Sequence, residues 1–246
     1  MVRYRDEEAE NEAEPVPNAP YATFTVPCSL LPVPCSLFPV PCSLFPVPYS
    51  LFPLLMTHSI LRMPENSRLT SQQFYDLCCA NPDWKLERTV EGNLVIMAPT
   101  GGETGARNAN LLIRLGIWNE QSQLGIVFDS STGFHLPNGA DRSPDVAWVK
   151  RERWEALTLA QREKFPPLAP DFVIELMSPT DNLKPAQLKM QEYLDNGVKL
   201  GWLFNRLAKQ VEIYQFGKPK QVLEQPNQLL GEPILPNFVL TLDGFW

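Results

Sequence analysis

Histidine is nearly absent from this chain: only His58 and His135 occur among its 246 residues. Nucleases that use a histidine base, Ser-His-Asp hydrolases and zinc hydrolases depend on this side chain. Two histidines are too few for these classes of enzyme. Cysteine is also scarce: there are five, three of them in a repeated segment, and none has the spacing of a zinc site or of a disulfide framework. We therefore expect a protein of a reducing compartment, the cytoplasm.

An excess of positive charge is missing as well. The chain has 28 acidic residues against 21 Lys and Arg, which gives a formal net charge of −7. Residues 1–55 hold six of the acids and two of the bases, so residues 56–246 keep 22 acids, 19 bases and a net charge of −3. A mildly acidic domain lacks the overall basic surface of a strong nucleic-acid binder, and any contact with DNA must therefore come from a local patch.

Residues 1–55 predict a disordered leader of low complexity. An acidic start is followed by four heptads of the type Val-Pro-Cys-Ser-Leu-Phe-Pro, which occupy Val26–Pro53. Tandem copies of a seven-nucleotide unit, GTTCCCT, encode this heptad, so we infer that the segment is translated repetitive DNA and that the working protein starts at Met56 or Met63. Disorder or loose polyproline II is expected here, with a ligand for an SH3-like groove as the alternative.

The leader also bears on membrane insertion. It is free of charge from Pro15 to Leu61, but eight prolines lie between Pro27 and Pro53. Each proline removes a backbone donor and clashes with the preceding helical turn, so this stretch cannot form a spanning helix. Its acidic start is the reverse of the basic region that opens a secretory signal. We expect no association with a membrane.

Residues 56–246 have the length of one ordinary domain. Hydrophobic residues recur along them with the periods of strands and of helices, in a hairpin and meander followed by a β-α-β unit. This order predicts an α/β (α+β) fold in which helices flank a central mixed β-sheet. The expected helices cover about 71–80, 108–121, 152–165 and 181–195, and the expected strands about 84–90, 93–97, 125–129, 133–136, 143–149, 172–177, 200–204, 211–215 and part of 236–246.

Two carboxylates stand inside runs that otherwise predict buried strands. Asp145 lies in Ser143–Val149, and Glu175 lies in Phe172–Met177 with apolar residues two positions away on either side. A charge buried without a partner costs several kcal/mol. If the two strands are neighbours, the carboxylates repel each other unless a cation lies between them, so the pattern predicts a site for Mg²⁺ or Mn²⁺ and phosphoryl chemistry. The alternative for either residue is a buried acid paired with arginine, or a capping role for Asp145.

The helix that follows Glu175 offers two lysines. Its apolar stripe contains Met190 and Tyr193, and Lys189 lies beside Tyr193 at the edge of this stripe. A lysine at such a border buries its stem and can reach towards a carboxylate pair, so Lys189 is the first candidate. Lys184 points further towards solvent and is the second. An ordinary solvated helix charge is the alternative for both.

These residues resemble a known nuclease pattern. Pro144-Asp145 followed by Glu175-Leu176-Met177 looks like the PD-(D/E)xK motif, in which Asp, Glu and Lys line one metal site. More closely, four stretches resemble the Uma2 (DUF820) family of endonucleases, which is abundant in cyanobacteria and has the restriction-endonuclease-like fold. The four stretches are Thr132–Gly139, Ser143–Val149, Asp171–Pro179 and Lys189–Leu203. The resemblance runs from about Thr70 to the C-terminus.

The resemblance implies a Mg²⁺-dependent (or Mn²⁺-dependent) DNA endonuclease. Asp145 and Glu175 would hold the metal, and Lys189 would orient the water or stabilise charge on the phosphate. The sequence departs from the motif at Met177, where Glu-x-Lys has its lysine, and the Uma2-like pattern supplies a lysine from the next helix instead. The alternative is a nuclease-fold protein without catalysis that binds DNA or a partner. A homodimer is expected by analogy with nucleases that cut both strands.

Other residues are weaker candidates for the same site. Glu87 is a further acid that could join the metal site, with a surface charge on a hairpin as the alternative. Gly101–Gly105 predicts a flexible loop that touches the DNA backbone. Arg107 and Arg114 stand seven residues apart on one face of the following helix and could contact phosphates, with a solvated face as the alternative.

Overall fold

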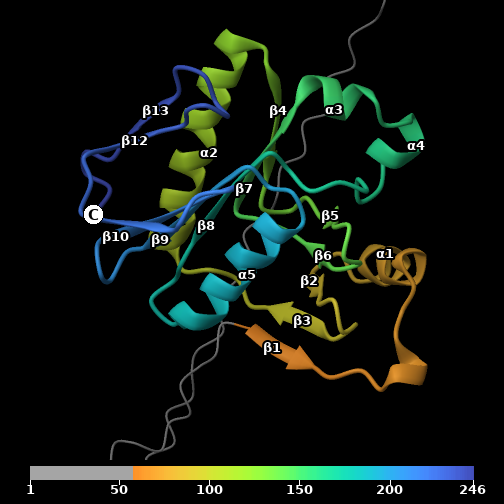
Figure 1. Cartoon of the computed structure of the whole chain (residues 1–246). Coiled ribbons are helices and arrows are strands. Elements are labelled where there is room, and N and C mark those ends of the chain that lie inside the picture. Colours follow the sequence, from red (N-terminus) through yellow and green to blue (C-terminus); the bar gives the residue numbers. More distant parts are fainter. Residues whose placement is uncertain (1–57) are drawn as a thin grey trace, which may run out of the picture. The chain divides into compact units, whose positions relative to one another are not determined.

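A computed structural model describes residues 58–246 (Figure 1). The leader, its heptads and the start at Met56 lie outside the described residues. The expected division at residue 55 therefore stays a prediction. Within the described part of the chain, no helix is both long and apolar enough to cross a membrane.

The core of the domain is a mixed six-stranded sheet in the order β11-β10-β9-β8-β7-β4. Only β8 and β9 pair in parallel, and the other neighbours are antiparallel. The predicted α/β class with a central mixed sheet is confirmed. The strands are β4 (Gly125–Asp129), β7 (Val146–Lys150), β8 (Phe172–Leu176), β9 (Leu200–Asn205), β10 (Gln210–Gln215) and β11 (Gln221–Glu224).

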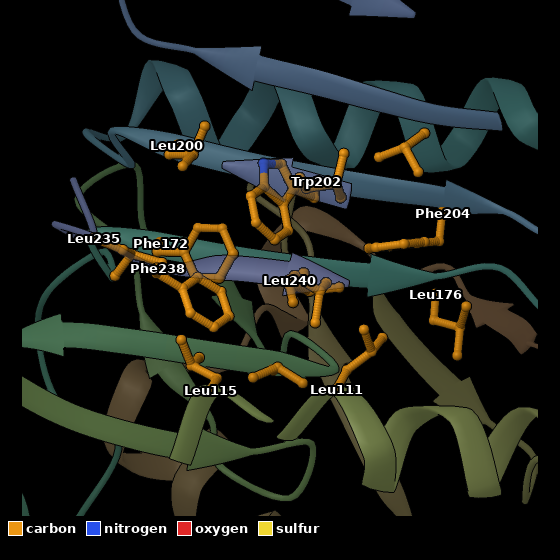
Figure 2. Packing of buried hydrophobic residues seen from close by; sticks show 14 of the residues in the cluster. Leu111, Leu115, Phe172, Leu176, Leu200, Trp202, Phe204, Leu235, Phe238 and Leu240 are labelled. Carbon is orange, nitrogen blue, oxygen red and sulfur yellow. The ribbon is translucent and has the colours of Figure 1, made fainter. Parts of the chain in front are cut away.

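One face of this sheet packs on α2 (Gly102–Ser122) and on the C-terminal hairpin of β12 (Gln228–Leu230) and β13 (Val239–Thr241). Because strand side chains alternate between faces, every second residue of β8 and β9 points to this side. Figure 2 shows the resulting cluster, in which Phe172 meets Trp202 edge to face and Leu111 and Leu115 close the layer from α2. Apolar side chains dominate this face, so the charged residues of a site are expected on the other side of the sheet.

The opposite face packs on α5 (Leu183–Asp195), which Figure 1 shows in front of the sheet. Met190 and Tyr193 of α5 are fully buried against Val173 and Leu203. A Cβ at Gly201 of β9 would collide with the side chain of Met190, so a glycine lets the helix approach the strand closely. Glu175 belongs to this face, because it alternates with residues that point towards α2.

A second sheet, in the order β1-β3-β2-β6-β5, adjoins the first through the connection between β6 and β7. Its strands are β1 (His58–Leu61), β2 (Lys85–Arg88), β3 (Leu94–Met97), β5 (Phe134–His135) and β6 (Asp141–Arg142), and η1 (Glu65–Ser67) follows β1. Helix α1 (Ser71–Ala80) begins at a capping box formed by Thr70 and Gln73 and packs Phe74 on this sheet. The segment predicted as one strand over 143–149 starts only at Val146, so Asp145 lies where the chain passes between the sheets.

Two other predicted elements are corrected by the structure. The single helix expected over 152–165 is two short helices, α3 (Arg151–Glu155) and α4 (Leu159–Arg162). The break occurs because Thr158 and Gln161 form a capping box that begins a new helix. The expected loop at Gly101–Gly105 is largely the first turn of α2, with Gly101 as the N-cap.

Candidate active site

Asp145 and Glu175 lie side by side at the edge where β7 and β8 pair. The antiparallel register aligns Val146 with Ile174, so the next position outward sets Asp145 opposite Glu175. The Asp145 carboxylate accepts a hydrogen bond from the backbone N–H of Leu176 at 2.8 Å, which anchors it to β8. The structure therefore brings the two carboxylates together on neighbouring strands, on the side of the sheet that faces α5.

Lys189 reaches this edge from α5. Its Nζ lies 2.9 Å from Glu175 Oε1 and 2.8 Å from Glu87 Oε1, so one ammonium bridges two carboxylates. Tyr193, one helical turn further, donates its hydroxyl to Glu175 Oε1 at 2.8 Å. Lys184 is exposed in the first turn of α5, five residues from Lys189 and on a different side of the helix.

Glu87 joins the site from the second sheet. It lies on β2, its residue is 2% exposed, and the alternative of a surface charge on a hairpin is therefore wrong. Besides Lys189, its carboxylate accepts hydrogen bonds from Arg142 at 3.1 Å and from the backbone N–H of Ser143 at 3.0 Å. Each oxygen of Glu87 is thus held by a donor.

Arg142 extends the network away from the paired strands. Its Nε lies 2.6 Å from Glu192 Oε2 on α5, and the other oxygen of Glu192 accepts from the side chain of Asn138 at 3.1 Å. Arg142 therefore ties the second sheet to α5 and has a carboxylate partner on each side. Its guanidinium is occupied by these two carboxylates and has a structural role.

The charges around Glu87 favour its ionised form. Burial raises the pKa of the Glu87 carboxyl, but the positive charges of Lys189 and Arg142 outweigh burial and lower this pKa to about 2. Glu87 is therefore a permanent anion at physiological pH. It serves as the counter-charge of Lys189 and Arg142.

At the paired strands β7 and β8, burial outweighs the effect of nearby positive charge on the carboxyl pKa values. Burial raises the pKa of Glu175 to about 7, since the opposing charge of Lys189 is countered by the negative charges of Asp145 and Glu87. Burial also raises the pKa of Asp145, although the charge of Lys85 opposes the shift. Both carboxyl groups have less positive charge around them than two buried anions need.

The donors of the site keep their protons. Burial lowers the pKa of Lys189, but Glu175 and Glu87 raise it above its usual range, so the ammonium stays charged. Burial and the negative charge of Glu175 raise the pKa of Tyr193 well above its usual range, so its phenol remains a hydrogen-bond donor. Neither group is suited to act as a base near neutral pH.

A divalent cation fits the residues at this edge. Asp145 and Glu175 offer carboxylate oxygens, which hard cations such as Mg²⁺ and Mn²⁺ prefer, and their raised pKa values record a deficit of positive charge. Within residues 58–246, no group of three or more His, Cys, Asp or Glu side chains is arranged to enclose a metal. Two carboxylates with retained waters suit Mg²⁺, which dehydrates reluctantly.

Comparison with known proteins now places the chain. The Uma2 family model, described as "Putative restriction endonuclease", matches residues 71–243. The chain belongs to the Uma2 family. A solved structure from Anabaena variabilis ATCC 29413, a "putative nuclease belonging to DUF820", superimposes with a TM-score of 0.60 at 18% identity over 71% of this chain and 96% of that chain. At that identity the likeness shows the fold, and no curated protein matches the chain.

Several residues of the candidate active site are not among those predicted from the sequence. Arg142, the backbone N–H of Ser143 and the hydroxyl of Tyr193 all bind its carboxylates. Lys85, on the same strand as Glu87, acts on the pKa of Asp145. Strand alternation could have signalled Lys85, because it lies two residues from Glu87, but no local pattern links Arg142 to a carboxylate on another strand.

Arg107 and Arg114 lie away from the carboxylates of the candidate active site. Both are on α2, which covers the opposite face of the six-stranded sheet. Arg107 donates to the carbonyl of Phe245 at 2.8 Å, and Arg114 donates to the hydroxyl of Thr241 at 2.8 Å. The structure thus uses both arginines to hold the C-terminal segment on α2, and contact with DNA stays a prediction.

His135 of the Uma2 fold lies between a serine and an aspartate. Its Nδ1 is 2.8 Å from Asp141 Oδ1, and its Nε2 is 3.3 Å from the hydroxyl of Ser71. Arg88 also pairs with Asp141, at 2.6 Å, and donates to the same hydroxyl at 3.1 Å. Arg88 and His135 thus share the Asp141 carboxylate and the Ser71 hydroxyl, and this cluster ties α1 to the second sheet.

Proposed function

We propose that this Uma2 protein is a divalent-metal-dependent endonuclease that hydrolyses phosphodiester bonds in DNA. The observation that carries the proposal is the pairing of Asp145 with Glu175, both with raised pKa values, beside the ammonium of Lys189. Two carboxylates that lack positive charge form a place for a hard cation. The match to a family described as "Putative restriction endonuclease" supports phosphodiester hydrolysis as the reaction.

Each residue of the site has its own role in the proposed reaction. Asp145 and Glu175 would hold Mg²⁺ or Mn²⁺, which when bound would supply Lewis acidity for a phosphate oxygen and for the attacking water. Glu175 must lose its proton to act as a ligand, and Tyr193 keeps its carboxylate in place. Lys189 stays protonated and orients the attacking water or stabilises the charge that builds on the phosphate.

A plasmid assay tests the proposal. Supercoiled plasmid incubated with the purified full chain and Mg²⁺ or Mn²⁺ is expected to be nicked, and EDTA is expected to stop the reaction. Asp145→Asn should lower the rate about 100-fold or more, since it weakens the hold on the metal. Asp243→Asn changes an exposed acid in the C-terminal segment and is the matched control. Equal cleavage by Asp145→Asn and the control would remove Asp145 from the site.

A second function is favoured by one observation. Lys189 already bridges Glu175 and Glu87, and Met177 replaces the lysine of the Glu-x-Lys pattern, so the site has a resident cation in a displaced position. A nuclease fold in this condition would bind DNA or a protein partner without cutting. Calorimetry separates the two functions: DNA binding with no Mn²⁺ site and no cleavage is the result expected of such a module.

The remaining expectations belong to the same proposal. DNA as the partner follows from the reaction, a homodimer would let two sites cut both strands, and a cytoplasmic location follows from the cysteine pattern. Analytical ultracentrifugation with and without a short duplex tests the oligomeric state. A monomer in both conditions would contradict the homodimer and leave the cleavage chemistry to be judged by the plasmid assay.

A further inference from the structure

Lys85 lies on the side of β2 that faces the proposed metal site. Residues two apart on a strand point to the same side, so Lys85 shares its direction with Glu87, whose carboxylate meets Lys189 and the N–H of Ser143. Leu86, which alternates with them, packs in the cluster under α1. Lys85 is therefore directed towards the chain that connects β6 with β7.

The pairing of β2 with β6 brings the start of β2 towards the segment that leads to Asp145. Strand β2 pairs with β6 in antiparallel fashion, with Arg88 opposite Asp141. Continued three residues beyond this pair, past the end of β6 at Arg142, the same alignment would bring Lys85 level with Pro144, the residue before Asp145. The positive charge of Lys85 also lowers the pKa of Asp145 more than the charge of Lys189 does. The side of β2 that Lys85 shares with Glu87 and its charge effect on Asp145 thus both indicate that the ammonium of Lys85 lies near the Asp145 carboxylate.

Lys85 differs from the other cations of the site in having its donors free. Lys189 bonds Glu87 and Glu175, and Arg142 bonds Glu87 and Glu192. Among the residues that the structure describes, none makes a hydrogen bond or an ion pair with the Lys85 side chain, which is half-buried. A lysine ammonium carries several donors and binds phosphate as a point charge. Lys85 can therefore accept a ligand without breaking any contact.

We propose that Lys85 is a catalytic residue of this site, whose ammonium contacts a non-bridging oxygen of the DNA phosphate next to Asp145. The inference rests on the proposed function, because it needs a phosphodiester at this edge of the sheet. It divides the positive charge of the site between two lysines from different sheets. Lys189 holds the carboxylates in place, and Lys85 meets the substrate.

DNA binding tests this contact without relying on cleavage. A fluorescein-labelled duplex is titrated with the full chain in EDTA over a range of salt concentrations, and anisotropy gives the affinity. Lys85→Met and Lys85→Gln should each bind about 10-fold more weakly and lower the salt slope by about 1, because one phosphate contact is lost. Lys85→Arg should restore the slope, since it keeps the charge. The control is Lys218→Met, an exposed lysine between β10 and β11.

Single-turnover cleavage with Mn²⁺ supplies the second measurement. Lys85→Met should cleave at least about 10-fold more slowly than Lys218→Met at saturating protein, and Lys85→Arg should recover most of this loss. Thermal melting of all four variants shows whether they fold, and the Lys85→Gln binding data stand in if Lys85→Met does not.

The outcomes separate this inference from the proposed function. If the wild type binds DNA without cutting it and Lys85→Gln lowers the salt slope, the nuclease proposal fails and the phosphate contact stands. If the wild type cuts and the Lys85 variants bind and cut like Lys218→Met, the inference is overturned and the nuclease proposal stands. A wild type that neither binds nor cuts DNA overturns both.

Discussion

Glu87 and Glu175 share one lysine, yet their carboxyl groups behave in opposite ways. Glu87, on the second sheet, is surrounded by Lys189, Arg142 and a backbone N–H, and its pKa falls to about 2. Glu175, on the central sheet, has Lys189 and the hydroxyl of Tyr193 but faces Asp145, and its pKa rises to about 7. Glu87 is 2% exposed and the side chain of Glu175 is 14% exposed, so this small difference in exposure does not explain the opposite pKa shifts.

The comparison shows that the number of positive partners decides the state of a buried acid. The half of the site on the second sheet is neutralised and serves as a scaffold for Lys189. The half on the paired strands β7 and β8 is short of positive charge, and this deficit is what a metal and the proposed phosphate-binding Lys85 would use. The predictions below aim to break or sharpen this contrast, from the largest expected effect to the smallest.

Removal of the shared lysine should have the largest effect on stability. Lys189→Met takes one partner from Glu87 and the main positive partner from Glu175, and leaves buried negative charge uncompensated. Loss of one partner of a buried ion pair typically costs about 3–5 kcal/mol, so we expect a decrease of that size in the free energy of unfolding at neutral pH. Urea denaturation measures it, with Lys218→Met as the control. A decrease similar to that of the control would show that Lys189 is not a structural counter-charge.

The pH dependence of stability should differ for the two acids. Glu175 has a folded pKa of about 7, above the usual 4.5, so the folded state holds its proton more tightly and stability falls as pH rises from 4.5 to 7. The loss is about 1.4 kcal/mol per pH unit, or about 3 kcal/mol in total. Glu87 has a folded pKa of about 2, so its contribution is complete above pH 4.5 and is lost as pH falls towards 2.

The metal-free protein should therefore be most stable near pH 4.5 to 5. Urea denaturation in EDTA at pH 5 and at pH 7.5 measures the change in the free energy of unfolding. Glu175→Gln should reduce the slope in this range, while Asp145, whose pKa is also raised, should keep part of it. A wild type that is equally stable at both values would contradict the raised pKa of Glu175.

Neutralisation of the two glutamates should change the free energy of unfolding to different extents. At pH 7.5, Glu87→Gln leaves Arg142 and Lys189 with one fewer anion each, and we expect the free energy of unfolding to fall by about 2 kcal/mol. Glu175→Gln removes a buried charge that has too few partners, so the free energy of unfolding should stay within about 1 kcal/mol of the wild type or rise. Differential scanning calorimetry of both variants in EDTA checks the order. Equal losses would show that the two halves of the site are not different in charge.

Added metal should give the smallest effect on stability. Mn²⁺ at a concentration a few times its dissociation constant should raise the free energy of unfolding by about 1 kcal/mol through mass action. Asp145→Asn should remove this gain, because it takes away one carboxylate. Melting curves with Mn²⁺ and with EDTA measure the difference, and Asp243→Asn should respond like the wild type. A gain that survives in Asp145→Asn would place the metal elsewhere.

Part of the site could be predicted from local pattern. Strand alternation identifies Glu175 as a polar residue on a face of apolar neighbours, and the helical stripe puts Lys189 beside Tyr193. These relations depend on residues a few positions apart, which is the range over which a strand or a helix has a fixed geometry. The helix expected over 71–80 is also a local relation, and its start is fixed by a capping box in which Thr70 and Gln73 are three residues apart.

The other part depends on contacts between distant residues. Lys189 meets Glu87 across 102 residues of sequence, and Arg142 meets Glu192 across 50. Periodicity within one segment does not reveal such pairs. It therefore does not decide whether Glu87 belongs to a metal site or is a surface charge. The pattern that predicts a strand over 143–149 does not predict that residues 141–142 pair with the second sheet. Alternation alone does not identify the partner of a strand.

The amino-acid sequence alone determined the class of fold, the strand that carries Glu175, the strand that directly follows Asp145, and the helix that carries Lys189. These follow from hydrophobic periods that any short segment reveals. Only the tertiary structure decided which acid is neutralised and which is left short of charge, and that Lys85 comes to Asp145 from another sheet. Electrostatic energy depends on distances in space, and the folded chain sets those distances between residues that the sequence keeps far apart.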